Sequence, residues 1–322
     1  MNESLPGFRL VRPQSVDQAV AALQSAPDAR ICAGGTDLIV NMRRGLVAAE
    51  TLVDLTGIAD LKALVINETG LRIGSGVTLR ELAGNPSITG PYQAIAQAAR
   101  AVAGPGHREV ATLGGNLCLD TRCLYYNQSD WWRKSNGYCL KYRGDICHVA
   151  PRGNRCRAAF SGDMAPALMV LGAEVEIAGP NGVRSLNLTD LYLEDGANYL
   201  ALNPGEILIA VRIPAQKVVS VYGKIRVRGA VDFPLAGVAV ASRGVPGGAR
   251  IFDMAITGTN PMPVRVNIPA PLRKDDDPDT YFATLEKLVQ KAVSPQRTST
   301  TAPHYRRLSV AALATRLARE LT

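Results

Sequence analysis

One segment of the sequence limits most strongly how this chain can fold, the 34-residue stretch from Cys123 to Cys156. It contains two further cysteines, Cys139 and Cys147, and little of it has helical or strand periodicity. Loops longer than about 15 residues are uncommon inside compact domains, and ordering each residue costs roughly 1–2 kcal/mol of chain entropy. Burial of its aromatic side chains offsets part of that cost. A cross-link through four thiolates would offset more, which predicts a metal centre with Cys123, Cys139, Cys147 and Cys156 as ligands.

The spacing of these cysteines bears on which metal they bind. Four thiolates suit Zn²⁺ or an iron–sulfur cluster, but structural zinc sites normally use closely spaced C-x₂₋₄-C pairs, which this stretch lacks. Its six Lys or Arg against two Asp also suit an anionic [4Fe–4S] cluster. Cys118 lies in an apolar run and Cys32 in a glycine loop, so neither is predicted to be a ligand. His148 is a further candidate, although a hydrogen-bonding or solvated histidine is the preferred interpretation.

Length and composition indicate an ordinary globular protein. With 322 residues, 47% hydrophobic and 20% charged, the chain can form two or three domains. Its first residues lack a signal segment, and no apolar run approaches the ~20 residues of a membrane span, so we expect a cytoplasmic protein with no membrane partner. A cysteine cluster in such a chain more often binds metal than forms disulfides. The net charge of +8 fits either a solvated basic surface or an acidic partner.

Short strands alternating with short helices predict an α+β fold. Strands are expected at 30–33, 51–57, 111–118 and 205–214, and helices at 91–103, 280–293 and 307–321. The alternation of apolar and polar residues over 221–244 predicts that a separate domain begins there.

Two glycine motifs are candidates for binding phosphate groups. In AGGTD (33–37), adjacent glycines would let backbone N–H groups approach phosphate oxygens, with Thr36 as a further donor and Asp37 orienting the loop or accepting from a ribose. ATLGGNL (111–117) has the same character. Each motif alone fits an ordinary turn or β-bulge equally well. Their occurrence in two apparent lobes predicts a pyrophosphate held between the lobes.

Other motifs are weaker. GSGVTL (74–79) lacks the third glycine of a Rossmann fingerprint, so a turn with Thr78 capping a helix is the better interpretation. Asp163 either caps a helix or contacts a ligand. No Ser/His/Asp or Cys/His arrangement is apparent, so we predict no catalytic residue and assign the chemistry to cofactors.

The chain resembles the FAD-binding medium subunits of the xanthine dehydrogenase/molybdenum hydroxylase family in several stretches. These are RICAGGTDL (30–38), ATLGGN (111–116), SGDMAPALMVLGAEVEI (161–177), GEILIAVRIP (205–214) and the region of Lys224. They occur in family order over nearly the whole chain. The resemblance implies a two-lobed FAD domain of the vanillyl-alcohol-oxidase (PCMH) type, followed by an α+β flavoprotein domain.

The same resemblance implies domain limits. The FAD-binding domain would span 1–217, with lobes at about 1–57 and 58–217. The cysteine-rich insertion would occupy 118–158, and a domain like that of CO dehydrogenase flavoproteins would span 218–322.

It also implies which residues bind FAD. One group would wrap the pyrophosphate: Ile31, Cys32, Ala33, Gly34, Gly35, Thr36, Asp37 and Leu38. A second group would hold it from the other lobe: Thr112, Leu113, Gly114, Gly115 and Asn116. The remaining predicted cofactor contacts are Val102, Asp163, Leu208 and Lys224.

The insertion distinguishes a subgroup, because common relatives connect the GGN and SGD motifs by a much shorter segment. It resembles the insertion of 4-hydroxybenzoyl-CoA reductase β subunits, which carries an extra [4Fe–4S] cluster. FAD subunits of some bacterial aldehyde oxidoreductases have a similar insertion and are the alternative.

The resemblance to these reductases implies an electron relay. Reduced ferredoxin would dock near the basic insertion, and electrons would pass through the cluster and FAD to a small subunit with two [2Fe–2S] centres. They would then reach a large molybdenum subunit that converts 4-hydroxybenzoyl-CoA to benzoyl-CoA, in a dimer of heterotrimers. An alternative of another class is a zinc-stabilised module whose basic loop binds nucleic acid, but such a module has no need of the glycine motifs.

Overall fold

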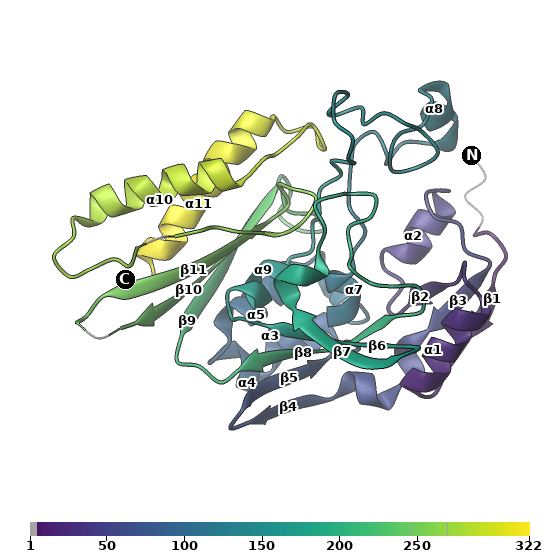
Figure 1. Ribbon diagram of the computed structural model, residues 1–322, viewed down its shortest axis with the longest axis horizontal. Helices are drawn as coiled ribbons and strands as arrows, with labels where there is room; N and C mark the ends of the chain where they lie inside the picture. The colour runs from purple at the N-terminus through teal and green to yellow at the C-terminus, as the bar shows by residue number, and fades with distance from the viewer. Residues whose placement is uncertain (1–4, 246, 269) are drawn as a thin grey trace.

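The computed structural model describes residues 5–245, 247–268 and 270–322, and it contains three β-sheets with helices packed on them (Figure 1). This mixture of helices and antiparallel and parallel strands confirms the α+β class. No helix in these described ranges is both long and apolar enough to span a membrane.

The N-terminal sheet is small and parallel, in the order β1-β3-β2. Its strands are β1 (Arg9–Val11), β2 (Arg30–Cys32) and β3 (Thr51–Asp54). Parallel strands need crossover connections, which are supplied by helices α1 (Val16–Ser25) and α2 (Leu38–Arg43). The Ser15 hydroxyl caps α1 by accepting a hydrogen bond of 3.2 Å from the Gln18 N–H.

The central sheet is antiparallel, in the order β4-β5-β8-β6-β7. Its strands are β4 (Leu64–Asn67), β5 (Gly70–Gly74), β6 (Glu174–Gly179), β7 (Gly182–Asn187) and β8 (Ile207–Pro214). Its helices are α3 (Leu79–Gly84), α4 (Pro86–Thr89), α5 (Gln93–Ala101), α6 (Pro105–Arg108), α7 (Leu113–Leu117) and α9 (Met164–Met169). Together they enclose the largest hydrophobic core of the described residues. Short 3-10 helices η1 (Leu55–Gly57), η2 (Ala59–Lys62) and η3 (Leu188–Leu191) complete the connections.

The C-terminal sheet has the order β12-β11-β10-β9. Its strands are β9 (Val219–Ile225), β10 (Ala236–Gly244), β11 (Arg250–Thr257) and β12 (Val264–Arg265), and helices α10 (Pro278–Ala292) and α11 (Pro303–Arg319) cover one face (Figure 1). Strand side chains alternate between faces. Val238 and Val240 therefore pack under α10 and α11, whereas Ala239 and Ala241 join the central core beside α9.

The insertion projects from the body as loops with one short helix, α8 (Asp130–Ser135), at the top of Figure 1. Its base is held by two hydrogen bonds of 2.7 Å between the backbones of Arg122 and Ala159. The Leu124 N–H donates to the Thr298 carbonyl at 2.8 Å, so the segment between α10 and α11 also supports it. The insertion therefore contacts both the central part of the chain and the segment between α10 and α11.

One expected element is wrong. Residues 111–118 were expected to be a strand, but 113–117 form helix α7. The reason is local capping, because the Thr112 hydroxyl accepts from the Gly115 N–H at 3.1 Å and starts a helical turn. The expected strand at 51–57 also ends early, because the Asp54 carboxylate accepts from the Thr56 N–H and turns the chain into η1. The strands and helices expected elsewhere are present with shifted ends.

Candidate functional site

The two glycine motifs lie against each other. A Cβ atom on Gly34 would overlap the carbonyl oxygen of Val110 and lie 2.9 Å from the Ala111 nitrogen, so only glycine fits there. Gly35 has a φ of +67°, which also favours glycine. The first motif therefore contacts the residues directly before Thr112.

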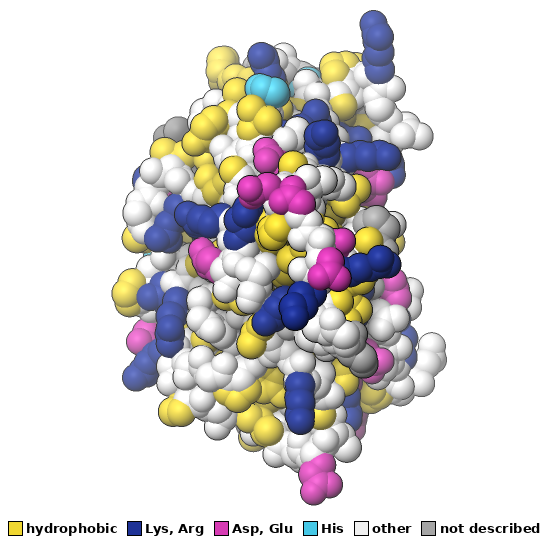
Figure 2. All heavy atoms as spheres, turned by 90° about the vertical axis from the view of Figure 1, so that its left-hand side faces the viewer, with side chains coloured by type: hydrophobic (Ala, Val, Ile, Leu, Met, Phe, Trp, Pro, Cys, Tyr) yellow, Lys and Arg dark blue, Asp and Glu magenta, His cyan; other side chains and the backbone are white. Residues whose placement is uncertain are grey.

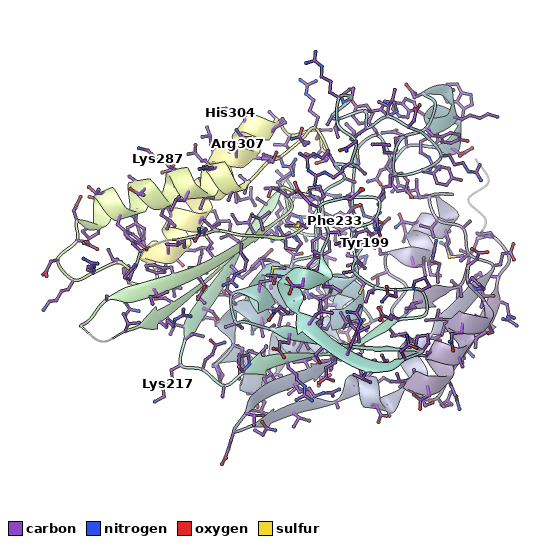
Figure 3. The ribbon with its side chains drawn as sticks, viewed as in Figure 1. Tyr199, Lys217, Phe233, Lys287, His304 and Arg307 are labelled. Carbon is purple, nitrogen blue, oxygen red and sulfur yellow. The ribbon has the colours of Figure 1, made fainter. Side chains whose placement is uncertain are left out.

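Asp37 ties the first motif to the base of the insertion. Its carboxylate pairs with the Arg122 guanidinium and accepts from the Asn41 side-chain amide at 3.0 Å. Arg122 is buried, and burial lowers its pKa. The guanidinium also lies 5.4 Å from the centre of the Phe233 ring. Figure 3 labels Phe233 and Tyr199 at the centre of the molecule.

The second motif leads to a buried carboxylate. The side-chain oxygen of Asn116, in α7, accepts from the Met164 N–H at 3.0 Å. This bond fixes the turn that contains Asp163 at the start of α9. A Cβ on Gly162 would lie 2.6 Å from the Asn116 carbonyl, so this turn packs directly on the second motif. The glycine of the Ser-Gly-Asp sequence thus lets the backbone before Asp163 pack closely on the second motif.

Asp163 does not cap its helix, so the capping interpretation is wrong. Its carboxylate accepts from the Lys224 ammonium at 3.0 Å and from the Tyr222 hydroxyl at 2.5 Å. Lys224 also donates to the Ala101 carbonyl at 3.0 Å. Burial raises the pKa of Asp163, whereas Lys224 and Tyr222 oppose that rise. The network connects α9, β9 and the end of α5.

The remaining predicted FAD contacts are more dispersed. Ile31 and Cys32 end strand β2, and burial raises the pKa of the Cys32 thiol, as does Asp54. Val102 follows α5, and its carbonyl accepts from Arg108 at 2.8 Å. Leu208 lies in β8 within the central core and outside the hydrogen-bonded network.

Sequence reasoning missed Arg122, Tyr222 and Phe233. Tyr222 precedes Lys224 by two residues in a strand, so the period of two would have placed both side chains on one face. Arg122 and Phe233 have no such local signal, because their partners lie far away in the sequence.

The four cysteines predicted as ligands line a single small pocket. Cys123, Cys139, Cys147 and Cys156 share this pocket with Lys141 and other side chains of the insertion. All six cysteines belong to the described residues and are free thiols, which gives no support to the disulfide alternative. Cys118 lies outside the pocket lining, and burial raises its pKa to about 12. Within the described ranges, no three His, Cys, Asp or Glu side chains form a group suited to one metal ion.

The cysteine thiols are close enough to influence one another. Burial raises the pKa of Cys123, and the charges of Cys147 and Cys139 add to the effect. Burial also raises the pKa of Cys156, to about 12, although the Ala158 N–H donates to its sulfur at 3.4 Å. His148 hydrogen-bonds the Tyr138 carbonyl through Nε2 at 2.6 Å, in agreement with the preferred interpretation of this residue.

Comparison with known proteins identifies the family. The family model described as "FAD binding domain in molybdopterin dehydrogenase" matches residues 6–216. The chain belongs to the FAD-binding medium subunits of the molybdenum hydroxylase family. As a member of this family it is a subunit of an oxidoreductase, and the expectation of an FAD-binding protein is confirmed.

Its relatives include several FAD-binding subunits of the family. The aldehyde oxidoreductase FAD-binding subunit PaoB of Escherichia coli is 33% identical over 73% of this chain and 77% of its own length. The carbon monoxide dehydrogenase medium chain of Afipia carboxidovorans is 32% identical over 65% of this chain and 60% of its own length. A solved structure of reconstituted CO dehydrogenase from Oligotropha carboxidovorans is 25% identical, with a TM-score of 0.78 over 99% of this chain and 98% of the other. The molybdenum hydroxylase fold therefore extends over the C-terminal sheet as well.

Proposed function

We propose that this medium subunit binds FAD between its glycine motifs and a [4Fe–4S] cluster in the cysteine pocket, and that it transfers electrons between a redox partner and a molybdenum subunit. The observation that carries the proposal is the convergence of Cys123, Cys139, Cys147 and Cys156 on one pocket of a chain in an FAD-binding family. When bound, FAD would supply two-electron chemistry and the cluster one-electron chemistry.

The FAD site fits a two-lobed domain of the vanillyl-alcohol-oxidase (PCMH) type. Lobes at about 1–57 and 58–217 would meet where Gly34 contacts Val110, and the domain at 218–322 would contribute Lys224 from β9. Ile31 to Leu38 and Thr112 to Asn116 would hold the pyrophosphate, with Val102, Asp163, Leu208 and Lys224 nearer the flavin. Large apolar side chains are exposed beside these contacts, as a planar ring system requires: Ile31, Val110, Val231 and Phe233.

We assign a cluster rather than a single ion to the cysteine pocket. In a [4Fe–4S] centre each cysteine binds a different iron, so the four sulfurs stand further apart than around one Zn²⁺. The described residues place four cysteines around one space, and the stretch lacks the closely spaced C-x₂₋₄-C pairs of structural zinc sites. The backbone N–H groups of Tyr125 and Tyr126 act to lower the pKa of Cys123, although burial outweighs them.

The proposed partners follow from the relatives and from charge. The relatives are named as subunits or chains of larger enzymes, which supports assembly of this chain with other subunits. We propose that these are a large molybdenum subunit and a small subunit with two [2Fe–2S] centres, in a dimer of heterotrimers. Basic side chains exposed on the insertion suit an acidic redox partner such as ferredoxin: Lys134, Arg143, Arg152 and Arg155.

A nucleic-acid-binding function lacks a comparable basis. On the face that Figure 2 presents, Lys and Arg are interspersed with acidic and apolar side chains and form no continuous basic patch. Family membership also accounts for the glycine motifs without nucleic acid.

Two substrates remain as candidates for the assembled enzyme. The 33% identity to an aldehyde oxidoreductase subunit favours aldehyde oxidation, with electrons leaving through this chain. The cysteine insertion also suits reductive dehydroxylation of 4-hydroxybenzoyl-CoA, with electrons entering from ferredoxin. Assays of the assembled enzyme with an aromatic aldehyde and an electron acceptor, and with 4-hydroxybenzoyl-CoA and a reduced donor, separate the two.

The first test of the proposal counts cofactors in the anaerobically purified chain. We expect one FAD and about four irons per chain, because a four-thiolate cluster holds four irons. Cys139→Ala should lose the iron and keep FAD, whereas the control Cys118→Ala should keep both. Zinc without flavin in the unmodified chain would contradict the proposal and favour the nucleic-acid-binding alternative.

A further inference from the structure

Lys141 occupies a distinctive position in the cysteine pocket. Among the described residues that line this pocket, only Lys141 carries a full positive charge. Its side chain is 6% exposed, although lysine is almost never buried without a partner. Lys141 is therefore not an ordinary solvated surface lysine, and its burial beside four thiols needs a separate explanation.

Three acceptors hold the Lys141 ammonium group. It donates to the Asp120 carboxylate at 2.8 Å, to the Thr121 hydroxyl at 2.6 Å and to the Gly196 carbonyl at 2.6 Å. An ammonium group has three N–H donors, so its hydrogen-bonding capacity is filled. The charge is therefore fixed in place.

Two aromatic rings flank the same ammonium group. Its nitrogen lies 5.3 Å from the centre of the Tyr126 ring and 5.4 Å from that of Tyr199. Tyr126 also lines the cysteine pocket, whereas the Tyr199 hydroxyl donates to the Cys118 carbonyl at 3.1 Å, just after α7. Lys141 thus connects the cysteine pocket with the segment that follows the second glycine motif.

A fixed charge at this place would act on the reduction potential of a cluster. A four-thiolate cluster gains one negative charge when it is reduced, so a nearby buried cation stabilises the reduced form more than the oxidised form. The Asp120 carboxylate acts in the opposite direction. It does not line the pocket, so the cation is the nearer of the two charges.

We propose that Lys141 is a positioning residue that raises the reduction potential of the cluster and holds the cysteine pocket against the FAD domain. This inference rests on the proposed function, because it requires a cluster in the pocket. If Lys141 only stabilised the fold, the reduction potential of the cluster would not depend on the sign of the charge that is removed. A residue that sets the potential gives opposite shifts when the positive and the negative partner are removed.

The test uses the full chain, purified anaerobically, with iron counted and the cluster titrated reductively while EPR follows its reduced form. Lys141→Met should lower the ratio of reduced to oxidised cluster at a fixed potential about tenfold, which is about 59 mV for a one-electron couple. Asp120→Asn should raise this ratio, because it removes the negative charge and keeps an oxygen acceptor. Lys141→Arg should stay near the unmodified protein, and Lys217→Met, which removes an exposed charge outside the insertion, should change the ratio little.

The outcomes separate the inference from the proposed function. If the unmodified chain holds no four-iron cluster, both are overturned. If the cluster is present and Lys141→Met keeps the original potential, only the inference is overturned. Shifts of the same sign in Lys141→Met and Asp120→Asn would also overturn it. If Lys141→Met does not retain its cluster, Asp120→Asn tests the inference alone. A reduction potential of Asp120→Asn at or below that of the unmodified protein would then contradict the inference.

Discussion

The Asp163 carboxylate and the Lys224 ammonium group form an ion pair of 3.0 Å in which each side chain is only 4% exposed. Asp163 lies at the start of α9 in the FAD-binding region, and Lys224 lies in β9 of the C-terminal sheet. The pair therefore joins the start of α9 to the C-terminal sheet. Both residues are predicted FAD contacts, so the pair would also fix the side of the site contributed by the C-terminal sheet.

Replacing Lys224 by methionine should destabilise the protein strongly. The change leaves the Asp163 carboxylate buried with Tyr222 as its remaining hydrogen-bond donor, and breaking a buried pair costs about 3–5 kcal/mol. Urea unfolding followed by circular dichroism measures the loss. Lys217→Met is the matched control, because Lys217 is exposed and extends from the body in Figure 3. Equal losses in both variants would contradict the importance of the pair.

Gly34→Ala should separate the two glycine motifs. The added methyl group would overlap backbone atoms of Val110, which cannot move aside as a side chain can. We expect a loss of about 1–3 kcal/mol in unfolding free energy and a large loss of bound flavin, measured by absorbance of the purified chain. Gly84→Ala is the control, because its Cβ would meet open space at the end of α3. Full flavin content in Gly34→Ala would contradict a site between the motifs.

The parts of the fold that could be predicted from sequence are those with a local signal. The apolar periodicity of 280–293 and 307–321 is long enough to reveal α10 and α11. Helix α7 has only five residues, too few to display a period, and the glycine pair led to the wrong prediction of a strand. The sequence signal for this helix was Thr112, because a threonine at the N-cap position accepts a hydrogen bond from the N–H three residues later, here that of Gly115.

Of the candidate site, only the residues that lie in family motifs could be predicted from the sequence. Asp163 and Lys224 were expected near the flavin, but composition cannot reveal that they pair with each other. Gly34 illustrates the same limit, since its need for glycine arises from Val110, which is distant in sequence. The convergence of four cysteines on one pocket could be predicted from the entropy cost of ordering so long a loop. No pattern in the sequence indicated that Lys141 would hydrogen-bond Asp120 and Gly196.

Stability should depend on Glu206 at low pH. Hydrogen bonds from Arg184 lower the pKa of Glu206 from about 4.5 to about 2, against the opposing effect of burial. A carboxyl group with a lowered folded-state pKa contributes stability above its unfolded-state pKa and loses it as the pH falls through the folded value. The contribution is therefore complete above about pH 5 and declines between about pH 4.5 and 2.

The variant Glu206→Gln measures this contribution. Because Arg184 is 39% exposed, solvent screening limits the gain to about 1–3 kcal/mol at pH 7. Urea unfolding at several pH values should show the gap between the unmodified protein and Glu206→Gln narrowing steadily below pH 4.5. The exposed Glu68→Gln serves as control for the loss of one carboxylate. A gap that stays constant down to about pH 3 would contradict the assignment.

Asp37 and Arg122 should show strong energetic coupling. The pair joins the first glycine motif to the base of the insertion, and Arg122 is buried with its Nε unpartnered among the described residues. Asp37→Asn alone should cost about 2–4 kcal/mol, because it leaves a buried cation without its counter-charge. Arg122→Met should cost a similar amount. The double variant should be less destabilised than the sum of the two by about 1–3 kcal/mol, as measured by a double-mutant cycle in urea. Simple additivity would mean that the ion pair contributes little to joining the first glycine motif to the base of the insertion.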